Sequence, residues 1–307
     1  MSVGKTNGKF LCFNGSCGAS GDLTELVKSI KHTNEFQTAR LIAKAKKDDP
    51  TDFTTLLTKA LEPVDFKEWQ YASTIPAMEE RLFESEKAYD YMVNTRGFEE
   101  SVLREYHVGY NAKRDLICVP MYTEKGLCVG VVGRPVQKGK VAFKNSPGLP
   151  QSKTLWNIHN AKRTGDVVIV CEATFDAMKI VQAGYPNVVA CLGGNFSEYH
   201  AQQLRKYFNT VIIMTDFDDA EKYKYKDCRK CFKRGLKECV GHNPGRATGE
   251  KIADLMTGKA VKWAAYDHKL IYPNGAKDPD EAGTAAIRQC IQNSVTNFEY
   301  QSWGIAS

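Results

Sequence analysis

Several features that would assign a chain to a familiar class are missing from these 307 residues. No stretch reaches the roughly 18 uncharged apolar residues of a membrane span, so no membrane partner is expected. The segment from Met1 to Lys9 has no apolar signal-peptide core, which makes the cytoplasm the expected compartment. No GxxxxGKS/T motif is present, which argues against an architecture that includes a P-loop ATPase. Internal repeats and low-complexity tracts are absent as well.

The charge balance and the cysteine content narrow the choice further. The formal net charge of +6 is compatible with a nucleic-acid partner without proving one. Ten cysteines fit either a disulfide framework or thiolate metal sites, and a chain of this length without a secretion signal favours metal ligation or buried free thiols. Four cysteines lie within apolar runs and are expected in the core: Cys118, Cys128, Cys171 and Cys191.

Composition divides the chain into five segments. A glycine-rich start gives way to a charged stretch that prolines interrupt, then to two helices and a hairpin, and then to strands that alternate with helices. Such alternation predicts a parallel α/β sheet covered on both faces. The expected segments are the start over 1–30, a helical linker over 31–84, a smaller mixed α+β subdomain over 85–164, the α/β domain over 165–295 and a tail over 296–307.

The hydrophobic pattern predicts the elements within these segments. In the subdomain we expect helices over 84–95 and 98–106, and strands over 116–122 and 127–133. In the α/β domain we expect strands over 167–171, 187–191, 211–215 and 261–266, and helices over 175–183, 198–208, 249–257 and 280–292.

Acidic residues follow two of the expected parallel strands. Glu172 comes directly after the first strand, and Asp216 and Asp218 come after the third. Because ligands bind beyond the carboxyl ends of parallel strands, both acidic groups are expected on the same edge. Asp176 lies four residues after Glu172 and shares its helix face. These acids are either helix caps and solvated loop residues or parts of one site.

Converging carboxylates need neutralisation. Two anions about 4 Å apart repel by on the order of 4 kcal/mol at intermediate dielectric. Either some of the acids are protonated or divalent cations neutralise them. Hard oxygen ligands with open positions suit Mg²⁺ or Mn²⁺, and about two such ions could orient a 3′-hydroxyl and stabilise a transferring phosphoryl group. Asp278 and Asp280, in KDPDE, follow the last expected strand by a loop.

The two acidic elements, CEATFDAM and MTDFDDA, resemble the two signatures of a Toprim domain. That domain occurs in DnaG-type primases, topoisomerases, OLD-type nucleases and RecR-like recombination proteins. Two positions depart from the pattern, since Ala173 replaces the usual glycine after the glutamate and Glu221 replaces the glycine after the Asp-x-Asp motif. The second departure predicts a rerouted backbone after the acids. The resemblance implies catalytic roles for Glu172, Asp216 and Asp218.

The segments before the Toprim signature resemble the DnaG primase catalytic core. They are NTRGFEESVLREYHVGY, GVVGR, VAFKNSPG and SKTLW, in that order. The resemblance, to a phage-like, truncated or split form of the family, implies a nucleotidyltransferase that makes RNA primers during DNA replication. It implies partners: a single-stranded DNA template, ribonucleoside triphosphates and a replicative helicase. Residues that would hold template and nucleotides are Arg96, Arg134, Lys144, Asn145 and Lys153. KDPDE implies that Asp278 and Asp280 join Glu172, Asp176, Asp216 and Asp218 around the Mg²⁺ or Mn²⁺ ions.

A zinc-binding insertion is expected within the Toprim domain, over about 221–246. Cys228-x2-Cys231 and Cys239-x2-His242 form two short pairs across a short spacer, which is typical of a tetrahedral structural Zn²⁺ site. Chance spacing in a cysteine-rich segment is the alternative. Basic residues alternate with aromatic ones in this insertion, which suits single-stranded nucleic acid and equally a solvated charged loop.

The N-terminal pair Cys12 and Cys17 resembles the second half of the zinc ribbon that precedes DnaG catalytic cores. The first half is absent, and two thiolates rarely close a structural site. Three explanations stay open: a second chain supplies the missing ligands, the site is vestigial, or the product is truncated or split. His32 is either a further ligand or a surface histidine.

Two other functions use the same features. A Toprim nuclease would use the acids to cut DNA, and a non-catalytic subunit would use the basic residues to hold single-stranded DNA. No tyrosine nucleophile can be assigned, which disfavours a topoisomerase.

Overall fold

The computed structural model divides into two compact units, Met1–Asp65 and Phe66–Ser307. It describes residues 65–136, 144–194, 196–218, 239, 241–265, 272 and 275–303, together with 2–3, 10–11, 20–21, 25, 27, 28 and 38. In the first unit, three two-residue strands form an antiparallel sheet: β1 (Ser2–Val3), β2 (Phe10–Leu11) and β3 (Ser20–Gly21). Cys12, Cys17 and His32 lie outside the described residues, so the half-ribbon stays a prediction.

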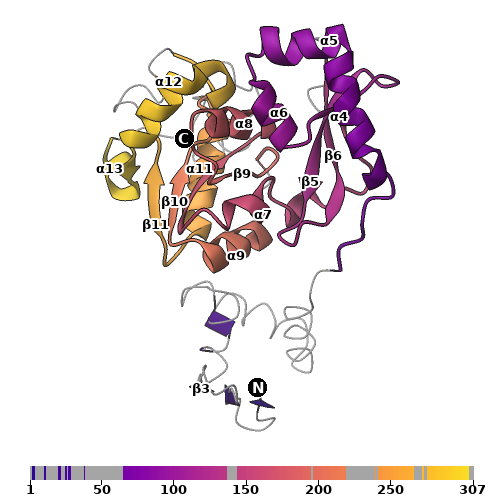
Figure 1. Ribbon diagram of the computed structural model, residues 1–307. Coiled ribbons are helices and arrows are strands. Elements are labelled where there is room, and N and C mark those ends of the chain that lie inside the picture. Colours follow the sequence, from indigo (N-terminus) through magenta and orange to yellow (C-terminus); the bar gives the residue numbers. More distant parts are fainter. Residues whose placement is uncertain are drawn as a thin grey trace. The chain divides into compact units, whose positions relative to one another are not determined.

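The second unit begins with an α+β subdomain (Figure 1). Its sheet is antiparallel, in the order β4-β5-β6-β7, and the expected strand over 116–122 is β5. The strands are β4 (Gly109–Asn111), β5 (Leu116–Tyr122), β6 (Cys128–Pro135) and β7 (Lys144–Asn145). The helical segments are η2 (Ala72–Thr74), α4 (Ile75–Glu84), α5 (Glu86–Tyr89), η3 (Asp90–Thr95) and α6 (Glu100–Glu105).

Helix α4 corrects the linker prediction over 31–84. Pro76 does not break a helix but lies in the first turn of α4, where its missing N–H has no intrahelical partner to lose. The helix packs closely on β4, since a Cβ added at Gly109 would meet the Cβ of Met78 at 2.6 Å. Residues 66–84 therefore belong to the second folded unit, because they bury apolar side chains on the subdomain sheet.

The single helix expected over 84–95 is also different. The short helix α5 continues into the wider π-helical turns of η3, and the Arg96 N–H donates to the Tyr91 carbonyl, five residues earlier. Such turns occur frequently at functional sites. Here the turns deliver Arg96 to the edge of the neighbouring α/β domain, where Asp280 lies.

The α/β domain confirms the expected parallel sheet, with one added edge strand. The strand order is β12-β11-β10-β8-β9, and only β12 is antiparallel to its neighbour. The strands are β8 (Val167–Cys171), β9 (Val188–Ala190), β10 (Thr210–Ile213), β11 (Ala260–Trp263) and β12 (Val295–Thr296). Strands β8, β9 and β10 are almost fully buried, as parallel strands covered on both faces should be, whereas β11 and β12 towards the edge are partly exposed.

Helices surround this sheet (Figure 1). They are α7 (Ile158–Ala161), α8 (Thr174–Gln182), α9 (Glu198–Tyr207), α11 (Pro244–Leu255), α12 (Pro279–Gln292) and α13 (Asn297–Ser302), and a single turn, η4 (Gln151–Lys153), precedes α7. Helix α8 packs against α12, and α11 packs against α9 and β10.

Within the expected tail over 296–307, the described residues 296–303 are folded. Tyr300 of α13 is only 2% exposed, and its ring stacks on Trp263 with 4.1 Å between the centroids. The Trp263 indole N–H also donates to Asn297 at 2.8 Å. This aromatic contact adds α13 to the domain, because it covers the end of β11.

The expected core cysteines are buried and unpaired: Cys118, Cys128, Cys171 and Cys191. Among the described residues, no helix has both the length and the apolar character that crossing a bilayer requires.

Candidate active site

The central acids, Glu172 and Asp216, follow the ends of two neighbouring strands. Strands β8 and β10 run parallel, with Val170 opposite Ile213, and Glu172 and Asp216 follow within three residues of that pair. Asp218 lies two residues further along. The sheet edge thus brings together acids that are more than forty residues apart in the sequence, as the strand pattern predicts.

Burial and the repulsion between neighbouring carboxylates raise the pKa values of Glu172 and Asp216. Burial, followed by the charges of Asp216 and Asp218, raises the pKa of Glu172 to about 8. Burial, followed by the charges of Asp278 and Asp218, raises the pKa of Asp216 to about 7. Within the described part of the chain, Glu172 Oε1 and Asp216 Oδ1 are buried without a hydrogen-bond partner. Such orphaned carboxylate oxygens are suited to a divalent cation.

Asp176 links this edge to helix α12. Its side chain is 4% exposed and accepts hydrogen bonds from the Ala173 N–H at 3.2 Å and the Asp280 N–H at 3.3 Å. Burial, followed by the charges of Asp216, Asp278 and Asp280, raises its pKa well above the usual range. Ala173 has a φ of −117°, an ordinary extended conformation, so the family's glycine is not needed there.

The N-terminus of α12 contributes the remaining two acids. Asp278 caps the helix by accepting from the Glu281 N–H at 2.9 Å, and the Lys277 ammonium lies 3.5 Å from the Asp278 carboxylate. The Phe217 N–H donates to the Lys277 carbonyl at 2.6 Å, which ties this loop to the Asp-x-Asp segment. All six predicted acids therefore belong to one electrostatically linked cluster.

The cluster is open rather than a closed cage. No three of the described His, Cys, Asp and Glu side chains form a group that could hold a metal ion unaided. Mg²⁺ keeps several waters and commonly binds through one or two carboxylates plus substrate phosphates. An open arrangement of acids is compatible with that mode of binding.

Asn243 is a site residue that the sequence reasoning missed. Its side-chain amide brackets the Asp218 backbone, accepting from the Asp218 N–H at 3.3 Å and donating to the Asp218 carbonyl at 2.8 Å. Its Oδ1 also accepts from the Arg246 N–H, which caps α11. The sequence signal was present, since Asn followed by Pro is typical of a helix start.

Gly245 lies directly against the acids. Its N–H donates to Asp218 Oδ2 at 3.1 Å, and an added Cβ would lie 2.0 Å from the Asp216 carbonyl oxygen. No side chain fits in that space. The Asn-Pro-Gly start of α11 therefore holds the Asp-x-Asp segment in place.

Two of the predicted basic residues meet at this edge. Arg96 pairs with Asp280, with 2.5 Å between Nη1 and Oδ2. The Arg96 and Arg134 guanidinium groups lie 5.7 Å and 4.7 Å from the centre of the Phe175 ring. Burial raises the pKa of Asp280, although both arginines act in the opposite direction. Phe175 was not predicted as a site residue, and it forms an apolar support for both guanidinium groups.

Lys179 is a buried residue that holds the backbone of the loop carrying Arg96. Its ammonium donates to the carbonyls of Arg96 at 2.6 Å and Gly97 at 2.8 Å, and it lies 4.2 Å from the centre of the Phe98 ring. Burial lowers its pKa. It holds the loop that presents Arg96, a role that no sequence motif indicates.

The other predicted basic and amide residues do not reach the acids. Lys144 and Asn145 form strand β7, opposite Gly133 and Val132 of β6, which places them one strand from Arg134. Lys153 lies in η4 and is exposed. Among the described contacts, none joins these three residues to the carboxylates.

Half of the predicted zinc set is described. Cys239 Sγ lies 3.5 Å from His242 Nε2, so two of the four predicted ligands are adjacent. Cys228 and Cys231 lie outside the described residues, as does the backbone around Glu221. The zinc site and the rerouted backbone after the acids stay predictions.

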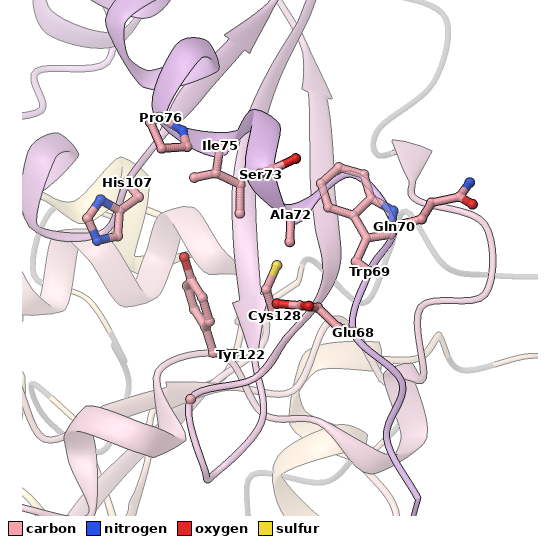
Figure 2. A pocket seen from close by; sticks show the side chains of 11 residues that line it. Glu68, Trp69, Gln70, Ala72, Ser73, Ile75, Pro76, His107, Tyr122 and Cys128 are labelled. Carbon is pink, nitrogen blue, oxygen red and sulfur yellow. The ribbon is translucent and has the colours of Figure 1, made fainter.

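A separate hollow of about 530 Å³ lies in the α+β subdomain. Figure 2 shows Trp69, Tyr122 and His107 around it, with the start of α4 along one side. None of the predicted site residues lines it. It is thus distinct from the acidic cluster.

This chain is similar in sequence and in fold to several known proteins. Residues 166–222 match the family model of the Toprim domain. A DNA primase of Clostridium acetobutylicum is 26% identical over 201 residues, which cover 62% of this chain and 29% of that protein. A DNA primase of Thermotoga maritima is 24% identical over 337 residues, which cover 94% of this chain and 53% of that protein. The chain spans about half or less of the length of these curated relatives.

The fold is also shared with a solved primase. The zinc-binding and RNA polymerase domains of the Aquifex aeolicus primase give a TM-score of 0.54 at 21% identity, over 97% of this chain and 76% of that chain. In sequence this chain is similar to the Toprim domain and to proteins named DNA primase, and it shares the fold of the solved primase.

Proposed function

We propose that this chain is the catalytic part of a DNA primase that synthesises short RNA primers on single-stranded DNA. The observation that carries the proposal is the acidic cluster, in which six carboxylates from β8, α8, β10 and α12 meet beside two arginines. The relatives named DNA primase support it, and so does a DnaG primase catalytic domain of the same fold that was solved bound to single-stranded DNA.

Glu172, Asp216 and Asp218 act as the central carboxylates in this proposal. Together with Asp176, Asp278 and Asp280 they would hold Mg²⁺ or Mn²⁺, and the orphaned oxygens of Glu172 and Asp216 are the best-placed ligands. About two such ions, when bound, would activate the 3′-hydroxyl of the growing primer and stabilise charge on the transferring phosphoryl group. The carboxylates would set the positions of these ions, because each acid lies at a strand end or a helix start.

The basic residues beside the acids would hold phosphates. Arg134 lies against Phe175 beside the acidic cluster, and its guanidinium group would pair with a phosphate of the template or of a nucleotide. Arg96 would act through Asp280, by setting the position of that carboxylate. Lys144, Asn145 and Lys153 would extend a ridge for the template and the incoming ribonucleoside triphosphates. Such contacts give affinity without reading sequence.

The insertion after Asp218 would hold a structural Zn²⁺. Four ligands are proposed: Cys228, Cys231, Cys239 and His242. The adjacency of Cys239 and His242 supports this set. The ion would tie the insertion to the start of α11, next to the acids. A replicative helicase as partner, and a phage origin, rest on resemblance alone.

Primer synthesis tests the proposal directly. The purified chain is incubated with single-stranded DNA, labelled ribonucleoside triphosphates and Mg²⁺ or Mn²⁺, and both the RNA and the DNA are sized. The expected result is short oligoribonucleotides that require template, metal and nucleotides, and that Asp216→Ala abolishes. Shortened DNA without nucleotide-dependent product would instead establish a nuclease. DNA binding that needs no metal, with no turnover of either substrate, would establish a binding subunit.

A further inference from the structure

The segment from Cys239 to Gly245 joins two features that the proposed function treats separately. At one end, a thiol and an imidazole face each other; at the other, an amide and a glycine hold Asp218. His242 and Asn243 are consecutive residues. Any force that fixes His242 therefore acts on Asn243 through one peptide bond.

The spacing of the Cys239–His242 pair fits a shared metal ion. Zn–S bonds of about 2.3 Å and Zn–N bonds of about 2.05 Å at the tetrahedral angle place sulfur and nitrogen about 3.5 Å apart. The distance between Cys239 Sγ and His242 Nε2 is 3.5 Å. A plain S–H···N hydrogen bond would have a similar length, so metal content has to distinguish the two.

Asn243 holds the backbone of Asp218 in place through hydrogen bonds. It contacts both the N–H and the carbonyl of Asp218, and its Oδ1 also receives the Arg246 N–H at 2.8 Å. These three hydrogen bonds lock residue 218 to the first turn of α11. Gly245 adds a fourth, from its N–H to the Asp218 carboxylate itself.

We propose that a Zn²⁺ ion on Cys239 and His242 is coupled through Asn243 to Asp218, so that filling this thiolate–imidazole site tightens divalent-cation binding at the acidic cluster. The inference rests on the proposed function in that it takes the acids as a Mg²⁺ or Mn²⁺ site. Asn243 is a positioning residue, because it touches the backbone that carries Asp218 and not the reacting atoms. Residues that orient metal ligands typically change metal affinity by about 10- to 100-fold when they are replaced.

The test measures Mn²⁺ binding to the full chain, by titration with detection of free Mn²⁺, in the absence of DNA and nucleotides. Zinc content is measured on the same samples. Cys239→Ser and His242→Ala are expected to lose one zinc per chain and to weaken Mn²⁺ binding by about tenfold. His107→Ala is the matched control, since this exposed histidine pairs with Glu79 away from the segment, and it should change neither quantity.

A second variant separates the coupling from simple unfolding. Asn243→Ser keeps a good helix cap for α11, but its shorter side chain cannot bracket Asp218. It should keep zinc and nearly wild-type thermal stability, yet weaken Mn²⁺ binding by about tenfold. Combining it with His242→Ala should add no further loss, because both changes break the same connection.

Three outcomes would overturn the inference. They are a purified wild type that contains no zinc at this pair, Mn²⁺ affinity unchanged in Cys239→Ser, and losses that multiply in the double variant. Failure of the proposed function is a different result: zinc and Mn²⁺ binding would stay coupled while the wild type makes no primers.

Discussion

The charges at the strand-end edge of the parallel sheet and those at the subdomain loop that carries Arg96 are balanced in opposite ways. At the parallel edge, Glu172 and Asp216 are buried against like charges, and each has an oxygen without a partner among the described residues. On the subdomain side, Arg96 is already paired with Asp280 and lies against an aromatic ring. The acidic edge therefore carries uncompensated repulsion that a cation relieves, whereas the basic side is largely satisfied. Changes at the acidic edge should therefore alter the response to divalent metal, and changes on the basic side should alter the response to ionic strength.

The largest effect is expected from Glu172→Gln. The amide keeps the shape of the side chain but removes a metal ligand, so primer synthesis should fall by on the order of 10²- to 10³-fold. Without metal, the same change removes repulsion and should raise the free energy of unfolding by about 1–3 kcal/mol. Activity assays and urea titrations in EDTA measure the two effects. The exposed Glu84→Gln is the control, and a variant that loses stability along with activity would contradict the comparison.

Gly245→Ala should lower the rate of primer synthesis by about 100-fold. The new Cβ would lie 2.0 Å from the Asp216 carbonyl oxygen, so the Asp-x-Asp backbone must move, and small displacements of catalytic groups have effects of this size. Gly258→Ala is the control. That glycine has a φ of +82° and no atom near the added Cβ, so it should lose stability without losing specific activity. Equal activity losses in the two variants would show that strain, not crowding at the acids, is responsible.

Arg134→Ala should weaken single-stranded DNA or nucleotide binding by about tenfold. The slope of the logarithm of the binding constant against the logarithm of the salt concentration should become smaller by about one. The guanidinium is proposed to neutralise a phosphate, and removing it leaves the acids intact. Fluorescence anisotropy at several salt concentrations measures the slope. Arg163→Ala, at an exposed position, should leave the slope unchanged. A loss of Mn²⁺ binding in Arg134→Ala would instead place this residue with the acids.

The smallest effect is a pH dependence of the metal-free protein. The folded-state pKa values of Glu172 and Asp216, about 8 and about 7, lie above the ordinary values of 4.5 and 3.8. Between these values the folded chain binds more protons than the unfolded chain, so stability is highest at the acidic end and falls as pH rises. In EDTA the free energy of unfolding should fall between pH 5 and pH 8, and with Mn²⁺ bound it should fall less over the same range. Glu172→Gln should flatten the slope, and a metal-free stability that rises over this range would contradict the account.

Strand placement was predictable where burial is uniform. The expected strands over 116–122 and 167–171 have the same limits as β5 and β8, because unbroken apolar runs that end at polar residues fix both ends. Helix α8 was also predicted to within one residue at each end. The positions of Glu172 and Asp216 at the sheet edge could be predicted as well, since they depend only on where two parallel strands end.

The rest of the site depends on contacts between distant segments. Helix α11 begins at Pro244, not at the expected residue 249, because its cap is also the residue that holds Asp218. The two-residue edge strand β12 is too short to leave a hydrophobic pattern. Lys179 looks like an ordinary helical lysine until the Arg96 and Gly97 carbonyls are placed above it. No local pattern encodes a hydrogen bond across more than eighty residues.

The most direct test of the central claim is ribonucleotide incorporation on single-stranded DNA by two matched variants, Asp216→Asn and Asp254→Asn. Asp254 is an exposed residue of α11, on the same domain but outside the acidic cluster. If the strand-end acids perform nucleotidyl transfer, Asp254→Asn makes primers at the wild-type rate and Asp216→Asn makes none. Primer synthesis that persists in Asp216→Asn would contradict the assignment.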